Sequence, residues 1–145
     1  FQLDGDPDVM KYITLGVPRT MDEVIEKSMP RVLQSYQDKS DFGIFAAYLI
    51  NSEKYIGWFQ FEKDKEFEDS IEIGWRLKKQ YWGNGYATEV ATVLCELGIK
   101  MGKTIVARAM IENLASIRVM EKAGLKFEKK FWYPDSSSPD VLYKR

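Results

Sequence analysis

The sequence has no histidine and one cysteine among its 145 residues. Without histidine there can be no Ser–His or Cys–His nucleophilic pair, no imidazole general base and no histidine-ligated metal site. A lone cysteine excludes a disulfide within the chain. Acid–base chemistry must therefore use carboxylates, hydroxyls, lysine or water, and we expect no metal.

Long apolar runs are also missing. The longest run, from Phe42 to Ile50, is too short to cross a bilayer, and no secretory hydrophobic segment opens the sequence. We therefore expect a cytoplasmic protein that does not insert into membranes. Because 45% of the 145 residues are hydrophobic, the chain fits one compact domain over 1–145.

A strong net charge is absent too, because 21 basic residues are balanced by 22 acidic ones. No overall field would gather nucleic acid. The halves differ, with 8 basic and 14 acidic residues in 1–71 (net −6) and 13 basic and 8 acidic residues in 72–145 (net +5). This is either a chance division of solvated faces, or an anionic ligand binds the C-terminal half and a cationic one meets the N-terminal half.

Hydrophobic periodicity and turn residues predict a mixed α/β chain. Thr20 and Glu23 match a capping box, and Pro30 should kink or divide the helix that follows them. The expected elements are helices near 6–13 and 20–38, a hairpin of 42–50 and 55–61, a strand at 70–77, a helix at 84–101, a strand at 104–110, a helix at 113–122, and strands near 126–132 and 140–144 joined by the loop 133–139.

Gly83 and Gly85 separate an alternating strand from the longest predicted helix. Glycines let the main chain approach a ligand, and the first helix amides lack partners, so such a turn can hold phosphates. A Walker A loop would need Lys and Ser/Thr where Tyr86-Ala87 stand, and a dinucleotide fingerprint would need a third glycine in place of Thr88. A plain tight turn before a helix would use the same two glycines.

Two motifs resemble a known family. Gln80-x-x-Gly83-x-Gly85-x-Ala87 resembles the Q/R-x-x-G-x-G/A signature of the GNAT N-acetyltransferases, and the segment from Asn113 to Gly124 is similar to their second signature. The approach Glu72-Ile-Gly-Trp-Arg-Leu77 is most similar to the branch that includes the ribosomal-protein N-terminal acetyltransferases. The resemblance covers about residues 42–145.

The resemblance implies a central mixed, mostly antiparallel sheet with helices on both faces. Two parallel strands, here 70–77 and 104–110, would splay apart around acetyl-CoA, the co-substrate. Family chains begin with a strand, and we find none ahead of Asp6. Either N-terminal residues lie outside this sequence, as Phe1 in place of an initiator methionine indicates, or the chain departs from the family pattern.

By the same resemblance, the coenzyme pyrophosphate would bind the glycine turn, and the pantetheine arm would pair with the strand backbone like an added strand. Asn113, which is also a good N-cap, would hydrogen-bond that arm. The expected cofactor-binding residues are Trp75, Arg76, Leu77, Gln80, Trp82, Gly83, Asn84, Gly85, Tyr86, Ala87, Thr88 and Asn113.

Glu72 is the candidate general base. It interrupts an apolar strand where several family members keep a catalytic glutamate, and desolvation there would strengthen it as a base; a glutamate on a solvated strand face is the alternative. Met120 stands where many relatives have a tyrosine acid, so Ser116, alone or with water, is the candidate acid. Cys95 is expected in the core.

The expected function is acetyl transfer from acetyl-CoA to a primary amine, on a protein N-terminus or a small molecule, within a ternary complex of a monomer or homodimer. The alternative is a non-catalytic acyl-CoA sensor or interaction module, which the missing tyrosine favours. The amine would enter on the side built by the N-terminal helices, the hairpin and the loop 133–139. Aromatic residues that could shape its pocket are Trp58, Phe59, Trp132 and Tyr133.

Overall fold

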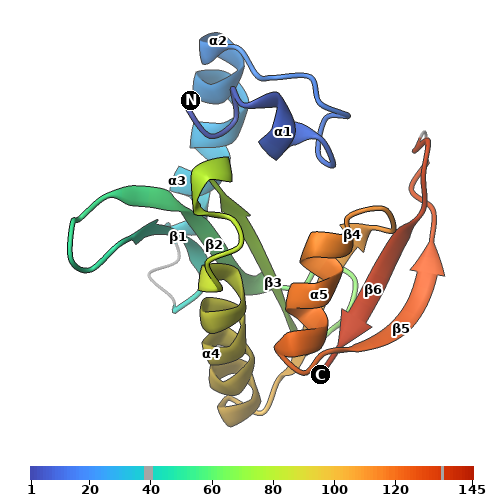
Figure 1. Cartoon of the computed structure of the whole chain (residues 1–145). Helices are drawn as coiled ribbons and strands as arrows, with labels where there is room; N and C mark the ends of the chain where they lie inside the picture. The colour runs from blue at the N-terminus through green and yellow to red at the C-terminus, as the bar shows by residue number, and fades with distance from the viewer. Residues whose placement is uncertain (38–40, 135) are drawn as a thin grey trace. The chain divides into compact units, whose positions relative to one another are not determined.

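The computed structural model describes residues 1–37, 41–134 and 136–145 (Figure 1). Six strands form one sheet in the order β1-β2-β3-β4-β6-β5. The β3–β4 pair is parallel, whereas β1–β2, β4–β6 and β5–β6 are antiparallel, which confirms the predicted mixed α/β fold class. The elements are α1 (Pro7–Met10), α2 (Met21–Glu23), η1 (Val24–Ser28), α3 (Met29–Ser35), β1 (Gly43–Tyr48), β2 (Tyr55–Lys63), β3 (Ser70–Leu77), η2 (Lys79–Tyr81), α4 (Tyr86–Lys100), β4 (Thr104–Met110), α5 (Leu114–Lys122), β5 (Lys126–Phe131) and β6 (Asp140–Lys144).

Contacts divide the chain into two compact units, residues 1–62 with 75–84 and residues 63–74 with 85–145. The first unit carries 9 basic and 10 acidic residues, and the second carries 12 of each. The charge difference between the sequence halves therefore does not carry over to the units, because the basic segment 76–79 belongs with the N-terminal residues and the acidic loop 63–69 with the C-terminal ones. The first unit is therefore close to neutral, and its net charge does not support long-range attraction of a cation to the N-terminal part.

In the first unit, the predicted capping box is present, because Thr20 and Glu23 exchange hydrogen bonds of 3.2 and 3.1 Å between side chain and backbone. The helix predicted over 20–38 is not one α-helix, since the π-helix η1 separates α2 from α3. Pro30 lies in the first turn of α3, where its missing N–H costs nothing. The predicted end at residue 38 lies outside the described residues, and the helix predicted over 6–13 is shorter, as α1.

Asp4 ties the N-terminal segment to β3 within the first unit. Its carboxylate accepts hydrogen bonds from Arg76 Nη1 at 2.5 Å, Ser28 Oγ at 3.0 Å and Arg19 Nη1 at 3.5 Å. Burial would raise the pKa of Asp4, but Arg76 and the other donors outweigh burial and lower it. This stabilisation is complete above the ordinary aspartate pKa of about 3.9 and is lost as the pH falls through the lowered value.

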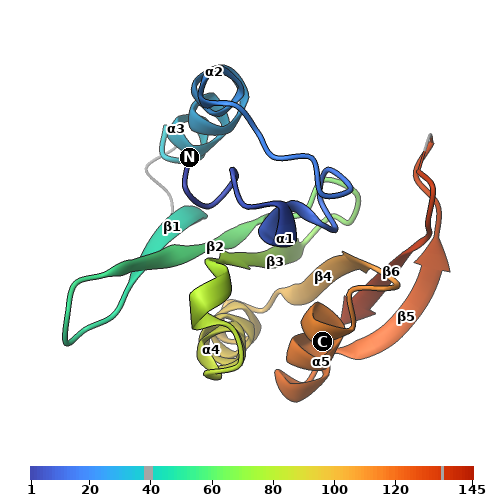
Figure 2. The same cartoon turned by 45° about the horizontal axis from the view of Figure 1, so that its top comes forward.

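In the second unit, α4 and α5 lie side by side on one face of β4 (Figures 1 and 2). A Cβ at Gly98 would lie 2.1 Å from Ile105 Cδ1, so α4 approaches the sheet through its small residues. Ala91 and Cys95 of α4 are fully buried, whereas Leu97 and the C-cap residue Met101 are 42% and 38% exposed. Among the described residues, no helix has the length and apolarity of a membrane span.

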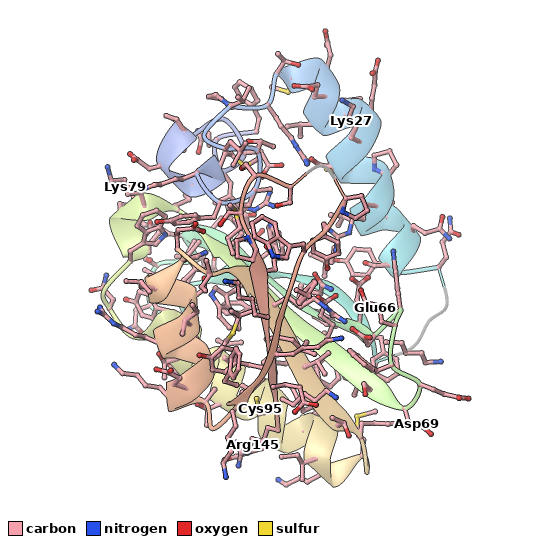
Figure 3. All side chains as sticks on the ribbon, turned by 90° about the vertical axis from the view of Figure 1, so that its right-hand side faces the viewer. Lys27, Glu66, Asp69, Lys79, Cys95 and Arg145 are labelled. Atoms are coloured by element: carbon pink, nitrogen blue, oxygen red, sulfur yellow. The ribbon has the colours of Figure 1, made fainter. Side chains whose placement is uncertain are left out.

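Cys95 is a core residue, as predicted. Its side chain is fully buried, and burial raises the pKa of the Cys95 thiol although the neighbouring Arg145 partly offsets the effect (Figure 3). A thiol in this environment is a poor nucleophile.

Candidate active site

The glycine turn before α4 has the geometry of an anion-binding main chain. Gly83 and Gly85 have φ of +77° and +85°, a conformation that L side chains rarely adopt. A Cβ built at either position would meet no atom within 4 Å, so there is open space along the backbone at both. The 15-residue helix α4 has Gly85 as its N-cap and no side-chain cap, which leaves its first amides to an outside acceptor. The turn therefore fits a phosphate group.

Trp82 fixes the start of this turn in the first unit. Its indole Nε1 donates to the Leu77 carbonyl at 2.8 Å, and Asn84 Nδ2 donates to the Trp82 carbonyl at 3.0 Å. Trp82 is 47% exposed even so. The indole thus holds the turn against the end of β3, and the Leu77 carbonyl, one group expected to pair with pantetheine, already accepts a hydrogen bond.

The Arg76 side chain is committed to the first unit's own structure. It is 11% exposed, binds Asp4 at 2.5 Å and lies with its guanidinium carbon 5.0 Å from the Trp58 ring centre. Burial lowers the pKa of Arg76, and Asp4 opposes that shift. Only the Arg76 backbone therefore remains available for the predicted coenzyme role. Of the expected pocket aromatics, Phe59 is 4% exposed and belongs to the core.

Basic side chains line an open hollow of the first unit next to Gln80. Lys78 donates to Gln2 at 3.2 Å, and Lys79, which is labelled in Figure 3, pairs with Asp8 at 2.6 Å. The partner Asp8 raises the pKa of Lys79, which keeps the ammonium charged. The hollow is lined by Gln2, Asp6, Lys78, Lys79 and Gln80.

The parallel pairing of β3 with β4 is short. In the described part of the chain it joins Ser70 to Thr104, Ile71 to Ile105 and Glu72 to Val106, and extends no further along β3. An end to the pairing in mid-strand is what a splayed parallel pair requires. Glu72 is the last β3 residue of this ladder.

Glu72 lies in a charged cluster of the second unit. Its Oε1 accepts a hydrogen bond from Arg108 Nη1 at 3.0 Å, and its side chain is 30% exposed. The sequence analysis expected either a desolvated base or a glutamate on a solvated strand face, whereas Glu72 is partly exposed and paired with a cation. Its role as general base stays a prediction.

Arg108 and Asp64 are the residues of this cluster that the sequence analysis missed. Arg108 Nη1 also donates to Asp64 Oδ2 at 2.5 Å. The signal in the sequence was a single charged residue, Arg108, within the apolar strand β4. The register of the structure then brings Arg108 to the face of Glu72, because Glu72 pairs with Val106 and alternate residues of a strand share a face. Among the described residues, no three Cys, Asp or Glu side chains gather into a metal site.

The start of α5 places Asn113 and Ser116 on one helical turn. Asn113 is the predicted N-cap, since its Oδ1 accepts a hydrogen bond from the Ser116 backbone N–H at 3.2 Å. Ser116 is half-buried. Met120 is 1% exposed, so the position of the family's tyrosine acid belongs to the apolar core here.

The segment after β5 carries exposed aromatic residues in the second unit. Trp132 is 60% exposed and Tyr133 is 43% exposed, with the Tyr133 ring edge-on to Phe131 at 5.1 Å. Burial raises the pKa of Tyr133, so its hydroxyl stays protonated near neutral pH. Residue 135 of the predicted loop 133–139 lies outside the described residues.

Comparisons with known proteins agree with the motifs. Residues 1–126 match the family described as "Acetyltransferase (GNAT) domain". The chain is 32% identical over 133 residues to the Bacillus subtilis N-acetyltransferase YnaD, covering 90% of this chain and 74% of that protein. It is 29% identical over 150 residues to the FsC-acetyl coenzyme A-N(2)-transacetylase of Aspergillus fumigatus, covering 95% of this chain and 61% of that protein's length.

Solved structures show the same fold. The crystal structure of a GNAT-family acetyltransferase from Bacillus anthracis matches with a TM-score of 0.80 and 29% identity over 99% of this chain and 84% of that one. The spermidine N-acetyltransferase of Vibrio cholerae, solved with CoA and spermine, matches with a TM-score of 0.73 over 99% of this chain and 85% of that one. At 13% identity, that second match concerns the fold alone.

Proposed function

Because this chain belongs to the GNAT family of acetyltransferases, we propose that it transfers an acetyl group from acetyl-CoA to a primary amine. The observation that carries the proposal is the left-handed glycine pair, Gly83 and Gly85, before the uncapped start of α4. This turn suits the pyrophosphate of the coenzyme. The name of the Aspergillus relative states transfer from acetyl coenzyme A to an N(2) position, which supports an amine as the acceptor.

The coenzyme would use main-chain groups more than side chains. The amides from Gly83 to Thr88 would bind the pyrophosphate, and the β3 backbone at Trp75–Leu77 would pair with the pantetheine arm. Asn113 caps α5 through its Oδ1 and would offer its amide Nδ2 to that arm. When bound, the coenzyme supplies the acetyl thioester.

The chemistry needs a neutral amine, a base and a proton for the leaving thiolate. The amine nitrogen attacks the thioester carbonyl carbon, the C–S bond breaks, the amine proton passes to Glu72, and the thiolate takes a proton from Ser116 or water. Transfer is direct, in a ternary complex, because the buried Cys95 with its raised pKa is unsuited to carry the acetyl group.

Ser116→Ala is expected to lower kcat by less than about tenfold, because water can replace one hydroxyl as a proton donor to a good leaving group. The cap on α5 should persist, since the Ser116 group bound to Asn113 is its backbone N–H. Steady-state kinetics with saturating acetyl-CoA measure the effect. A loss as large as that of a general base would make Ser116 the principal acid.

The acceptor amine would be the α-amine of a protein or peptide, as the Glu72–Leu77 segment resembles the N-terminal acetyltransferase branch, or a small amine. Thiol release from acetyl-CoA, assayed in turn with N-terminal peptides, polyamines, free amino acids and aminoglycosides, tests the proposal. We expect thiol release with one of these classes of amine, and we propose that the reaction takes place in the cytoplasm. If the protein binds acetyl-CoA but releases no thiol with any of these amines, a non-catalytic acyl-CoA sensor is favoured. The buried Met120 in place of a tyrosine acid is consistent with that alternative.

A further inference from the structure

A buried arginine lies behind Glu72 in the second unit. The Arg108 side chain is 9% exposed, and a single nitrogen, Nη1, donates to both Glu72 Oε1 at 3.0 Å and Asp64 Oδ2 at 2.5 Å. Arg108 comes from the middle of β4 and Glu72 from β3. The guanidinium thus links the candidate base to a second carboxylate.

Asp64 is itself held in place. Its side chain is 1% exposed, and its Oδ1 accepts hydrogen bonds from the backbone N–H groups of Glu66 at 2.9 Å and Phe67 at 2.7 Å. Burial would raise the pKa of Asp64, but Arg108 and the two amides outweigh burial and lower it. Asp64 is therefore an ionised anchor for Arg108 at every working pH.

The guanidinium is enclosed on its other sides as well. Glu66 Oε2 lies 3.3 Å from Arg108 Nη2, and the Phe67 ring centre lies 5.7 Å from the guanidinium carbon. Burial alone would lower the pKa of Arg108, but Asp64 and Glu72 outweigh it and the net shift is upward. The cation therefore stays charged and has little freedom to move.

A buried ion pair is expensive unless something is gained from its geometry. We propose that Arg108 is a positioning residue, which fixes the Glu72 carboxylate at the end of the β3–β4 ladder and is itself fixed by Asp64. Arg108 touches no reacting atom in this account and acts through Glu72. The inference rests on the proposed function, because it assigns Arg108 a part in that reaction.

The test is a double-mutant cycle with Glu72→Gln, Arg108→Gln and the double variant. Arg108→Gln should lower kcat about 10²-fold, the cost expected of misplacing a reacting group by about 1 Å, with little change in KM for acetyl-CoA. In the Glu72→Gln background, the same change should cost almost nothing further, because there is no base left to position.

The unequal effect on kcat and on acetyl-CoA binding is the readout that a merely structural role would not produce. If Arg108 only held the fold together, Arg108→Gln should weaken acetyl-CoA binding along with turnover. A positioning role lowers kcat and leaves the thermal shift given by acetyl-CoA intact.

Two further variants keep the test decisive. Should Arg108→Gln fail to fold, Asp64→Asn leaves the arginine in place but loosens its anchor, and should give a smaller loss of kcat with the same non-additivity. Arg145→Gln is the control, since Arg145 is an arginine of the same unit that donates to the Ala123 carbonyl at 2.8 Å, and kcat should be unchanged.

Additive losses in the cycle, with wild-type turnover normal and Glu72→Gln impaired, would overturn the positioning role and leave the proposed function standing. A wild-type protein that turns over no acceptor, or a Glu72→Gln variant of normal activity, would overturn the proposed function and the positioning role with it.

Discussion

Gly85→Leu is expected to abolish the thermal stabilisation that acetyl-CoA gives to the wild-type protein, while the circular-dichroism spectrum stays near native. Gly85 has φ of +85° and no atom within 4 Å of a Cβ placed there, so a leucine side chain would enter the space a phosphate would occupy. A ligand that binds only the native state stabilises it by RT ln(1 + [L]/Kd), so a weaker affinity gives a smaller thermal shift. Differential scanning fluorimetry over a series of acetyl-CoA concentrations measures the loss.

Gly102→Leu is the matched control. Gly102 follows the other end of α4 with φ of +71° and, like Gly85, has no atom within 4 Å of an added Cβ. Both variants carry the cost of a left-handed L residue, about 1–3 kcal/mol. The acetyl-CoA shift should survive in Gly102→Leu alone. An unchanged shift in Gly85→Leu would remove the coenzyme from the glycine turn.

Glu72→Gln is expected to lower kcat by about 10²–10⁴-fold with little change in acetyl-CoA affinity, which is the range for loss of a general base. Glutamine keeps the shape and can still accept a hydrogen bond from Arg108, but it cannot take a proton from the amine. Steady-state kinetics with the best acceptor and a thermal shift with acetyl-CoA separate the two effects.

Glu128→Gln is the control for this change, because Glu128 is an exposed β5 glutamate paired with Lys144 at 3.3 Å. Its kcat should equal that of the wild type. Normal turnover in Glu72→Gln would show that Glu72 is not the base and that its side chain only pairs with Arg108 on a solvated strand face.

The strands and the glycine turn could be predicted from the sequence because their signals are local. Alternation predicted β3, and the left-handed φ values of Gly83 and Gly85 follow from residues that adopt them freely. Asn113 as the cap of α5 likewise depends on a side chain and an amide three residues apart.

The partners of the charged residues could not be predicted in this way. Arg76 bonds to Asp4, 72 positions away in the chain, and Arg108 to Asp64 and Glu72, 44 and 36 positions away. A one-dimensional pattern places a charge on a strand face but does not name the group opposite it. The Arg76 side chain was therefore expected at the coenzyme, and Arg108 was overlooked.

The division of the helix predicted over 20–38 could be expected from Pro30, because proline is tolerated in the first turn of a helix and not in its interior. The π-helix η1 separates α2 from α3, and Pro30 lies in the first turn of α3. The π-helical form of the preceding turn has no signal in the hydrophobic periodicity, which averages over such a local change.

The most direct measurement of the central claim is a single-turnover reaction of the wild-type protein with acetyl-CoA and the best acceptor from the amine panel, followed by mass spectrometry of acceptor and protein. We predict one acetylated amine for each CoA released, and no acetylated protein when the acceptor is left out. Acetyl-CoA that stays intact beside every amine, or an acetyl group that appears on the protein before the acceptor, would contradict direct transfer from acetyl-CoA to an amine.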